Sequence, residues 1–575
     1  MAATALAACH SSATATANLP SKGGTLNVIL SNQPINNLDP QEISLANDSD
    51  ISHLLDRTLT TVNAAGQVVP DLATDTGRPS QDLKTWEFTL KSGLRWQDGT
   101  PVRCQDVQYG IERRFNKTIN AANGLNYPLT YLVDNQTPYK GPFGNVGVSA
   151  DKTLSSIVCI DQNTIQFHLT QPYGDFGYTV SVSTFAPMKY GGNADNDYSA
   201  DGSKTSTNYD PFSDGPYEVD YKKSVIQLDP SSGFHYASHL ELVRNPYWSR
   251  ATDSVRKAYP DRIVFDYDAS KPKVTNALIQ SGTPYYQNAI NLDSDVSSQF
   301  VQQVINDPAL SKRAVAGFEG ATRYFAINTI KMSKLGCRQA LEYGFDKFAW
   351  RFEAGGAVFG QLATSMIPPN LLAHANFDIY DTTGKPDGNA TEAAKLWKQN
   401  NCPSSVKIAF PNASGLPQQM STVVRAYQNA NIRVVLDPLP QQTYFDQLIS
   451  PRSDFDMSLV GWVPDWANGS AVIPPLFGGQ PVAYALKHNQ PVGNSNFSYI
   501  DNPSLDTAIS DAFKQSDLAT QYKLWGQLDH TVMAQAYAIP ILFTRGLRMT
   551  GTNVRGAVMS AAYGEPDLSS IGVVS

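Results

Sequence analysis

The chain has 575 residues, of which 41% are hydrophobic and 17% are charged, so it is too long for one core and too apolar for a disordered protein. Its net charge is −8 without any basic run or stripe, so nucleic acid is not expected as a partner. No apolar stretch approaches the roughly 20 residues needed to span a bilayer. These features indicate a folded protein of two or more domains.

The N-terminus is expected to be a lipoprotein leader. Its apolar run, residues 2–8, ends in Leu6-Ala7-Ala8-Cys9, and small residues before a cysteine are what a lipoprotein signal peptidase accepts. The run is shorter than a usual signal-peptide core and has no Lys or Arg before it, so an Ala-rich disordered leader is the alternative. Because a Ser-, Thr-, Ala- and Gly-rich tether follows at residues 11–24, we expect residues 1–23 to form leader and tether, with lipid on Cys9.

In the first half of the chain the apolar pattern predicts strands and one clear helix. Residues 23–30 and 84–99 alternate apolar and polar side chains, and the second of these segments ends in a turn. Residues 105–115 carry apolar residues at helical spacing, which predicts a helix. Residues 163–173 and 262–268 are predicted as two further strands.

In the second half the pattern alternates between helices and short apolar strands. Residues 337–350 and 417–430 have helical spacing, whereas residues 406–410, 432–439 and 456–462 are short apolar strands. Strands separated by helices are typical of parallel α/β units, so we expect such units in this half.

Four cysteines follow Cys9, namely Cys104, Cys159, Cys337 and Cys402. An even number in an exported chain suggests two disulfides, for which three connectivities are possible. Four buried free thiols are the alternative. The sequence contains no C-x-x-C, and its eight histidines form no cluster with ligand spacing, so no metal is expected.

No recognisable catalytic motif is present. The sequence lacks G-x-S-x-G, H-E-x-x-H and G-x-x-x-x-G-K-[ST], so we do not expect an enzyme and no cofactor is implied. The remaining alternative is a secreted enzyme or adhesion protein whose site is assembled from distant residues.

Several segments in collinear order resemble the peptide-binding branch of the bacterial ABC-importer solute-binding proteins, family 5, the oligopeptide- and dipeptide-binding lipoproteins. The most recognisable is WEFTLKSGLRWQDGTPVRCQDVQYGIERRF, residues 86–115. The others are GGTLNV at 23–28, NLDP at 37–40, VVPDLAT at 68–74, DGPYEV at 214–219, LELVRNPYW at 240–248, CRQALEYGFDK at 337–347, GWVPDW at 461–466 and AIPIL at 538–542. The chain departs from the family at Arg103-Cys104, where a Thr N-cap worth about 1 kcal/mol is missing, and at residues 282–289.

The resemblance implies a two-lobe α/β fold of the periplasmic-binding-protein (Venus-flytrap) type, with a hinge and with lobe I enlarged by an extra subdomain. Lobe I would hold residues 24–272 and 541–575, and lobe II residues 273–540. A peptide ligand would be enclosed between the lobes and delivered to the permease subunits of an ABC importer. The protein would be a monomer, lipid-anchored at the extracytoplasmic face of the bacterial membrane.

The same resemblance narrows the possible pairings of the four cysteines. Cys104 and Cys159 would both lie in lobe I, and Cys337 and Cys402 would both lie in lobe II. Either cross-pairing would tie the lobes together and obstruct closure, so we expect Cys104–Cys159 and Cys337–Cys402.

The resemblance also implies the ligand contacts. Asp465 matches the carboxylate that pairs with the α-amino group of a bound peptide. The backbone of Gly461 and Val463 would pair with the extended peptide as a strand would, and Trp462 and Trp466 would wall the first side-chain pocket. The alternatives are that Asp465 caps a turn with both indoles in the core, or that the aromatic residues serve an oligosaccharide ligand.

Overall fold

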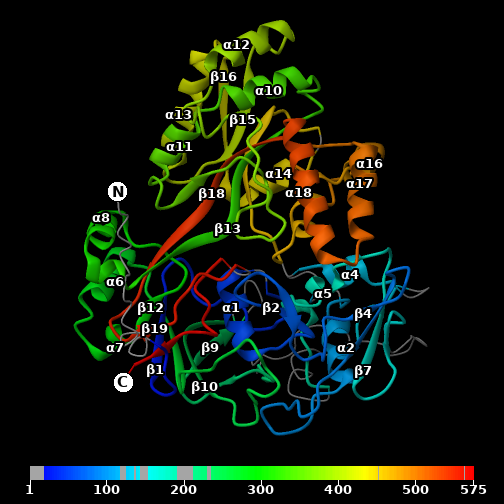
Figure 1. Cartoon of the computed structure of the whole chain (residues 1–575), viewed down its shortest axis with the longest axis vertical. Coiled ribbons are helices and arrows are strands. Elements are labelled where there is room, and N and C mark those ends of the chain that lie inside the picture. The colour runs from blue at the N-terminus through cyan, green and yellow to red at the C-terminus, as the bar shows by residue number, and fades with distance from the viewer. Residues whose placement is uncertain are drawn as a thin grey trace, which may run out of the picture.

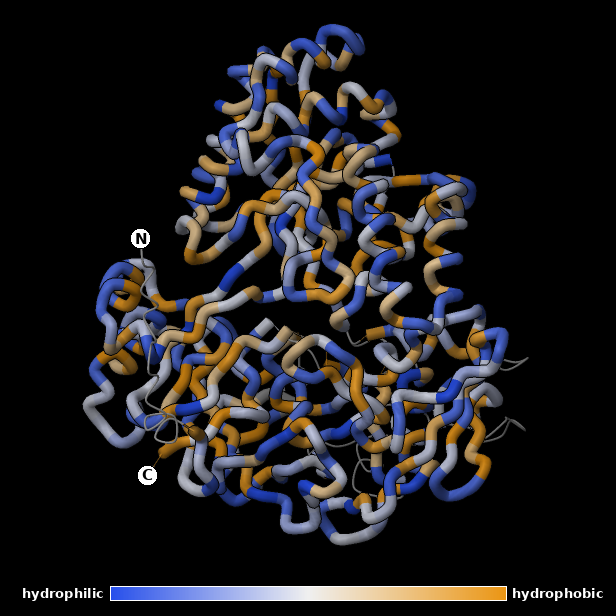
Figure 2. The backbone as a smooth tube through the Cα atoms, in the orientation of Figure 1, coloured by the Kyte–Doolittle hydropathy of each residue, from blue (hydrophilic) through white to orange (hydrophobic). Residues whose placement is uncertain are grey.

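The structure is a computed structural model that describes residues 19–43, 45–116, 119, 125–134, 138–142, 153–190, 211–228, 235–450, 452–561 and 564–574. Cys9, the predicted lipidation site, lies outside the described residues. Figure 1 shows two lobes, one below the other, connected by two long strands, β13 (Ala314–Ile327) and β18 (Ala538–Met549). In Figure 2 the central strands of both lobes are mostly hydrophobic, whereas the outer turns are mostly hydrophilic.

Lobe I is built on a mixed sheet in the order β12-β1-β11-β10-β8, with β9 paired to β10. β1 runs parallel to both β11 and β12, whereas β10 is antiparallel to β11. The strands are β1 (Thr25–Leu30), β8 (Tyr217–Val219), β9 (Val225–Leu228), β10 (His235–Arg244), β11 (Arg262–Tyr267) and β12 (Ala289–Asn291). Helix α1 (Ala46–Leu55) packs its Ile51 and Leu54 into the same core as Leu26 and Val28 of β1.

The segment after β11 also belongs to lobe I. β12 pairs in parallel with β1, and the surrounding helices bury Val274 and Leu278 against Ile29. These helices are α6 (Lys271–Gln280), α7 (Pro284–Gln287), α8 (Ser298–Asn306) and α9 (Pro308–Ser311). The predicted end of the first lobe I segment at residue 272 is therefore misplaced, because the chain first leaves lobe I along β13. The predicted return of the chain to lobe I at residue 541 falls inside β18. β19 (Val554–Arg555) and β20 (Gly572–Val573) complete lobe I after β18.

The extra subdomain of lobe I is a four-stranded antiparallel sheet in the order β4-β5-β7-β6. The predicted strands form its centre, with Trp86 opposite Phe167. Its elements and those beside it are β2 (Thr60–Val62), β3 (Val68–Pro70), β4 (Arg78–Pro79), β5 (Thr85–Thr89), α2 (Cys104–Arg113), α4 (Tyr127–Tyr131), β6 (Ile157–Cys159), β7 (Thr164–His168), α5 (Phe176–Thr179) and η2 (Ser183–Phe185). At the start of α2, where the Thr cap is missing, Asp106 accepts a hydrogen bond from the Arg103 backbone N–H at 2.8 Å.

Lobe II contains a six-stranded sheet in the order β14-β18-β13-β17-β15-β16. β15 runs parallel to both β16 and β17, as the helix–strand alternation predicted. The strands not yet given are β14 (Gly360–Leu362), β15 (Val406–Pro411), β16 (Val434–Leu439) and β17 (Met457–Trp462). The helices are α10 (Leu335–Tyr343), α11 (Lys347–Glu353), α12 (Ala390–Gln399), α13 (Leu416–Asn429), η4 (Gln441–Thr443), α14 (Tyr444–Leu448), η5 (Gly469–Ala471), α15 (Ile473–Phe477), α16 (Gln480–His488), α17 (Pro503–Phe513) and α18 (Leu518–Ala534).

The helix predicted over residues 337–350 is two helices, α10 and α11. Gly344 ends the first, and the Asp346 side chain begins the second by accepting a hydrogen bond from the Ala349 backbone N–H at 2.7 Å. A glycine followed by an N-cap aspartate favours such a break over a continuous helix.

Both disulfides have the expected pairing. Cys104–Cys159 joins α2 to β6 with a Cα–Cα distance of 5.8 Å, and Cys337–Cys402 joins α10 to the loop after α12 with 5.6 Å. Each bridge lies within one lobe, so neither restrains the movement of one lobe against the other.

The two lobes are connected where the β13–β18 ladder is interrupted. The strands pair from Ala314 opposite Met549 to Phe318 opposite Arg545 and resume at Thr322 opposite Phe543. Gly320, between these stretches, has a φ of +75°, which favours glycine over other residues. A second register shift follows between Arg323 and Tyr324. Irregular pairing of this kind is where a hinge would bend. Among the described residues, no helix is long and apolar enough to cross a membrane.

Candidate ligand-binding site

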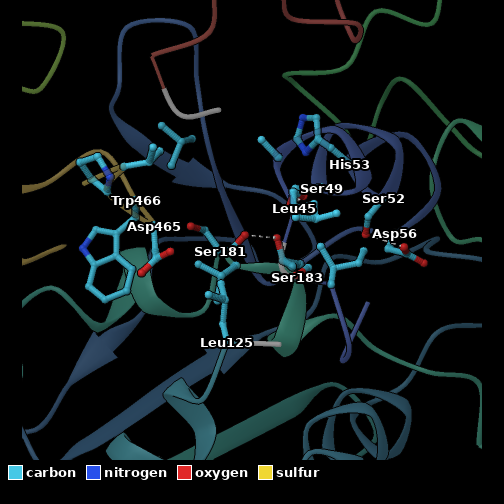
Figure 3. A pocket seen from close by; sticks show the side chains of 17 residues that line it. Leu45, Ser49, Ser52, His53, Asp56, Leu125, Ser181, Ser183, Asp465 and Trp466 are labelled. Carbon is cyan, nitrogen blue, oxygen red and sulfur yellow. Dashed lines mark hydrogen bonds between the residues drawn. The ribbon is translucent and has the colours of Figure 1, made fainter. Parts of the chain in front are cut away.

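A cavity of about 360 Å³ lies between the lobes, and both lobes line it. Figure 3 shows Asp465 and Trp466 on one side, His53 and Asp56 on the other, and Ser181 between them. The residues from lobe I are Ile43, Leu45, Ala46, Ser49, Ser52, His53, Asp56, Thr58, Val62, Leu125, Ser181, Val182 and Ser183, and those from lobe II are Val463, Pro464, Asp465 and Trp466. No Lys or Arg is among these described lining residues, so the cavity has an acidic wall without a cation.

A second cavity of about 480 Å³ adjoins the first, because Ala46 and Val463 line both. It extends toward the connecting strands and contains Glu319 of β13 and Arg548 of β18. The two cavities together indicate an elongated space between the lobes, which suits a ligand longer than a single amino acid.

Strand β17 positions the segment 461–466 at this space. The strand is central in the lobe II sheet, and its residues 457–460 are buried. The chain leaves the sheet at Trp462, so the next residues reach the interlobe space. Val463 is 53% exposed, and its backbone makes no hydrogen bond to the described residues. Ligand sites commonly form just beyond the carboxyl ends of parallel strands, as here beside β15.

Asp465 is a half-buried carboxylate that has no cationic partner in the part of the chain the structure describes. It accepts a short hydrogen bond from the Tyr127 hydroxyl of α4, and among the described residues no Lys, Arg or His forms an ion pair with it. Burial raises the pKa of Asp465 to about 6, an effect that the Tyr127 hydrogen bond partly offsets. A carboxylate in this environment is stabilised in its ionised form by an incoming cation.

No hydrogen bond among the described residues supports the alternative that Asp465 caps a turn. Within the described part of the chain, no backbone N–H donates to this carboxylate. The cap of the following turn is Asn468, which accepts a hydrogen bond from the Gly469 backbone N–H at 2.7 Å.

The two tryptophans differ in position. Trp466 is 2% exposed, lines the cavity, and contacts the Tyr127 ring edge-on with a centroid distance of 4.8 Å. Trp462 does not line this cavity; its indole N–H donates to the Ala471 carbonyl at 2.7 Å and its ring packs against the neighbouring core. The cavity thus brings together Asp465, Val463 and Trp466, whereas Gly461 and Trp462 lie outside its wall.

The lobe I side of the site was missed by sequence reasoning. Tyr127 lies 338 positions from Asp465 in the chain, and Ser181 lies just before η2, which begins at Ser183, in a stretch with no distinctive motif. No local signal marks these residues as ligand-facing, because only lobe packing brings them to Asp465.

The lobes meet beside the cavity through buried polar contacts. Asp175 of lobe I is 3% exposed and accepts hydrogen bonds from Asn468 at 2.9 Å and from the Ser470 hydroxyl of lobe II. Nearby, the Gly174 backbone N–H donates to the Phe513 carbonyl at 2.6 Å. These contacts hold the lobes together around the cavity.

Two lobes that share a cavity and are joined by two strands define a protein that encloses a solute between them. A family model described as "Bacterial extracellular solute-binding proteins, family 5 Middle" matches residues 67–484, and the chain belongs to this family. The family and the two-lobe fold predicted from the sequence are therefore confirmed. Its members are extracellular binding proteins rather than enzymes.

Similar proteins span nearly the whole chain. The oligopeptide-binding protein OppA of Bacillus subtilis (strain 168) is 21% identical over 569 residues, covering 94% of this chain and 91% of the relative. Among solved structures, the "Clavulanic acid biosynthesis oligopeptide binding protein 2" has a TM-score of 0.83 and 26% identity, with 97% of each chain covered. The "MppA Periplasmic Murein Tripeptide Binding Protein, Unliganded Open Form" has a TM-score of 0.74 and 17% identity, with 97% and 99% covered.

Proposed function

We propose that this protein is the extracytoplasmic component of an ABC importer that captures peptides between its lobes and delivers them to the permease. The observation that carries the proposal is Asp465, a carboxylate in an interlobe cavity whose described wall contains no cation. A peptide supplies the missing cation through its α-ammonium group. Relatives and structural neighbours named for oligopeptide binding support the same ligand class.

The backbone beyond β17 suits an extended ligand. Val463 is exposed and its N–H and C=O groups are unpaired within the described residues, so they are open to a strand-like partner. Trp466 and Tyr127 surround the carboxylate with aromatic surface, which lowers the local dielectric and strengthens an ion pair with the ammonium group.

The oligosaccharide alternative has less support. Among the described residues that line the cavity, Trp466 is the only Trp, Tyr or Phe. Trp462 does not add a second ring, because its indole packs against the neighbouring core and donates to Ala471. A sugar pocket built on stacked aromatic rings would need a second ring at this wall.

The proposal extends to the anchor and the assembly. Cys9 after its run of small residues supports a lipid anchor that keeps the protein near its permease, and the protein acts as a monomer.

A ligand panel tests the proposed function. Calorimetry and thermal shift should show binding and stabilisation for trialanine, roughly 30-fold weaker binding for N-acetyl-trialanine, and no binding for cellotriose. At 100 times its dissociation constant, a ligand adds about 2.7 kcal/mol to stability. Native mass spectrometry of the freshly purified protein should show co-purified peptide masses. Binding of cellotriose together with no response to a range of peptides would overturn the proposal.

A further inference from the structure

A chain of hydrogen bonds connects the wall of the ligand cavity to a carboxylate of the other lobe. Trp466 lies next to Asp465 in the cavity wall (Figure 3), and its indole N–H donates to the Ser470 hydroxyl oxygen at 2.8 Å. The Ser470 hydroxyl in turn donates a short hydrogen bond to Oδ2 of Asp175, which belongs to lobe I. Trp466, Ser470 and Asp175 are each at most 3% exposed, so solvent is largely excluded from these bonds.

The direction of each hydrogen bond follows from the groups that form it. An indole N–H can only donate, and a carboxylate oxygen accepts. A serine hydroxyl has a single hydrogen, so its bond to Asp175 turns the oxygen lone pairs toward the Trp466 N–H. Without an acceptor at position 175 the hydroxyl would be free to rotate, and the indole would lose its fixed partner.

Asp175 accepts hydrogen bonds from two side chains of one lobe II loop. It directly precedes α5, and the Asn468 amide nitrogen donates to the same Oδ2 at 2.9 Å. Asn468 also donates to Gln521 of α18 at 2.7 Å, so both lobes fix this loop. Burial raises the pKa of Asp175, and the hydrogen bonds from Ser470 and Asn468 partly offset that effect. Displacing either donor would leave a buried carboxylate undersatisfied, so the loop has one favoured position.

The position of the Trp466 ring matters because this ring forms part of the pocket around Asp465. It lines the cavity and contacts the ring of Tyr127, whose hydroxyl donates to Asp465. A displaced indole would disturb the packing of Tyr127 and admit water beside the carboxylate. Water raises the local dielectric and so weakens an ion pair with a bound ammonium group.

We infer that Asp175 is a positioning residue for the ligand, because it fixes the Trp466 indole beside Asp465 through Ser470. The inference rests on the proposed function. Asp175 is not among the described residues that line the cavity, and it lies 295 positions from Ser470 in the chain. Its effect on peptide affinity should therefore depend on the indole N–H rather than on contact with the peptide.

A double-mutant cycle on trialanine binding, measured by calorimetry, tests this dependence. Asp175→Ala and Ser470→Ala should each weaken binding about tenfold, and Asp175→Asn, which keeps an accepting oxygen, only about threefold. Trp466→Phe keeps a ring but removes the N–H, so Asp175→Ala in that background should cost at most about twofold more. Tyr522→Phe is the matched control, because it removes a hydrogen bond to Tyr178 across the same lobe boundary. Its effect should be the same with Trp466 or Phe at position 466.

Nuclear magnetic resonance gives a second readout that a merely structural role would not change. In protein labelled with 15N-tryptophan, the indole signal of Trp466 is the one missing from the spectrum of Trp466→Phe. This signal should move in Asp175→Ala and in Ser470→Ala, and it should stay in place in Tyr522→Phe.

The outcomes separate this inference from the proposed function. If Asp175→Ala weakens binding by the same factor with and without the indole, or leaves the Trp466 signal unmoved, the inference is overturned. Wild-type binding of trialanine that is weakened by N-acetylation would then still support the proposed function. If the wild type binds no peptide, the proposed function fails and this inference with it. Unfolding temperatures show whether each variant folds, and Asp175→Leu, which fills the space without accepting a hydrogen bond, replaces Asp175→Ala if that variant does not.

Discussion

Replacing Asp465 by Asn should remove the charge that receives the peptide ammonium while keeping the shape of the site. Removing one member of a desolvated charge pair typically costs about 2–5 kcal/mol of binding free energy. Asp465 is half-buried, and an asparagine oxygen can still accept the Tyr127 hydrogen bond. We therefore expect the lower end, about 2 kcal/mol, or roughly 30-fold weaker binding of trialanine.

The assay is a calorimetric double cycle of Asp465→Asn against N-acetylation of the peptide. Each change alone removes the same interaction, so the two together should cost little more than one. The coupling free energy should be about 2 kcal/mol. Asp446→Asn serves as the control, because Asp446 is exposed on α14 and does not line the cavity. Strictly additive losses would refute the reasoning, since they would mean that Asp465 does not contact the amine.

Three further expectations follow from the same contacts. Because the free pKa of Asp465 is about 6 and a bound ammonium lowers it, trialanine affinity should approach its full value above about pH 7 and fall about tenfold from pH 7 to pH 5. The affinity of Asp465→Asn should stay flat over this range. A Cβ atom at Gly174 would lie 1.9 Å from the Gln515 carbonyl oxygen of the other lobe. Gly174→Ala should therefore separate the lobes, increase the radius of gyration in X-ray scattering and weaken trialanine binding. Gly282→Ala is the control, because a Cβ atom there meets open space and should have none of these effects. Unchanged scattering of Gly174→Ala would contradict this. In a complete precursor, Cys9→Ser should release the protein into the medium, and continued membrane retention would count against lipidation.

Local pattern identified the elements with the clearest apolar periodicity. Period-2 alternation identified β5 and β7, and helical spacing identified α2 to within two residues at either end. The alternation of strands and helices predicted the parallel arrangement of β15, β16 and β17. These features were predictable because they depend on neighbours in the chain. The break at Gly344 was missed because the apolar spacing continues across it.

The disulfide pairing and the ligand-binding segment were predicted from the family resemblance rather than from local pattern. The four cysteines alone allowed three connectivities, and the pairing followed only once a two-lobe fold was assumed from the family resemblance. The same resemblance placed the ligand at residues 461–466, and the structure brings Asp465, Val463 and Trp466 of that segment to the interlobe cavity. The local sequence gave no reason for Trp462 to turn away, since its position is set by a hydrogen bond to Ala471.

The sequence by itself determined that this chain is a two-lobe binding protein and which segment carries its acidic group. Only the tertiary structure decided what surrounds that group. Tyr127 reaches Asp465 from the other lobe, Asp175 accepts a hydrogen bond from Ser470 across the lobe boundary, and the three-residue β12 joins lobe I through its pairing with β1. Such contacts join residues far apart in the chain, because they depend on how whole helices and strands pack. The periodicity of a local stretch of sequence does not encode that packing.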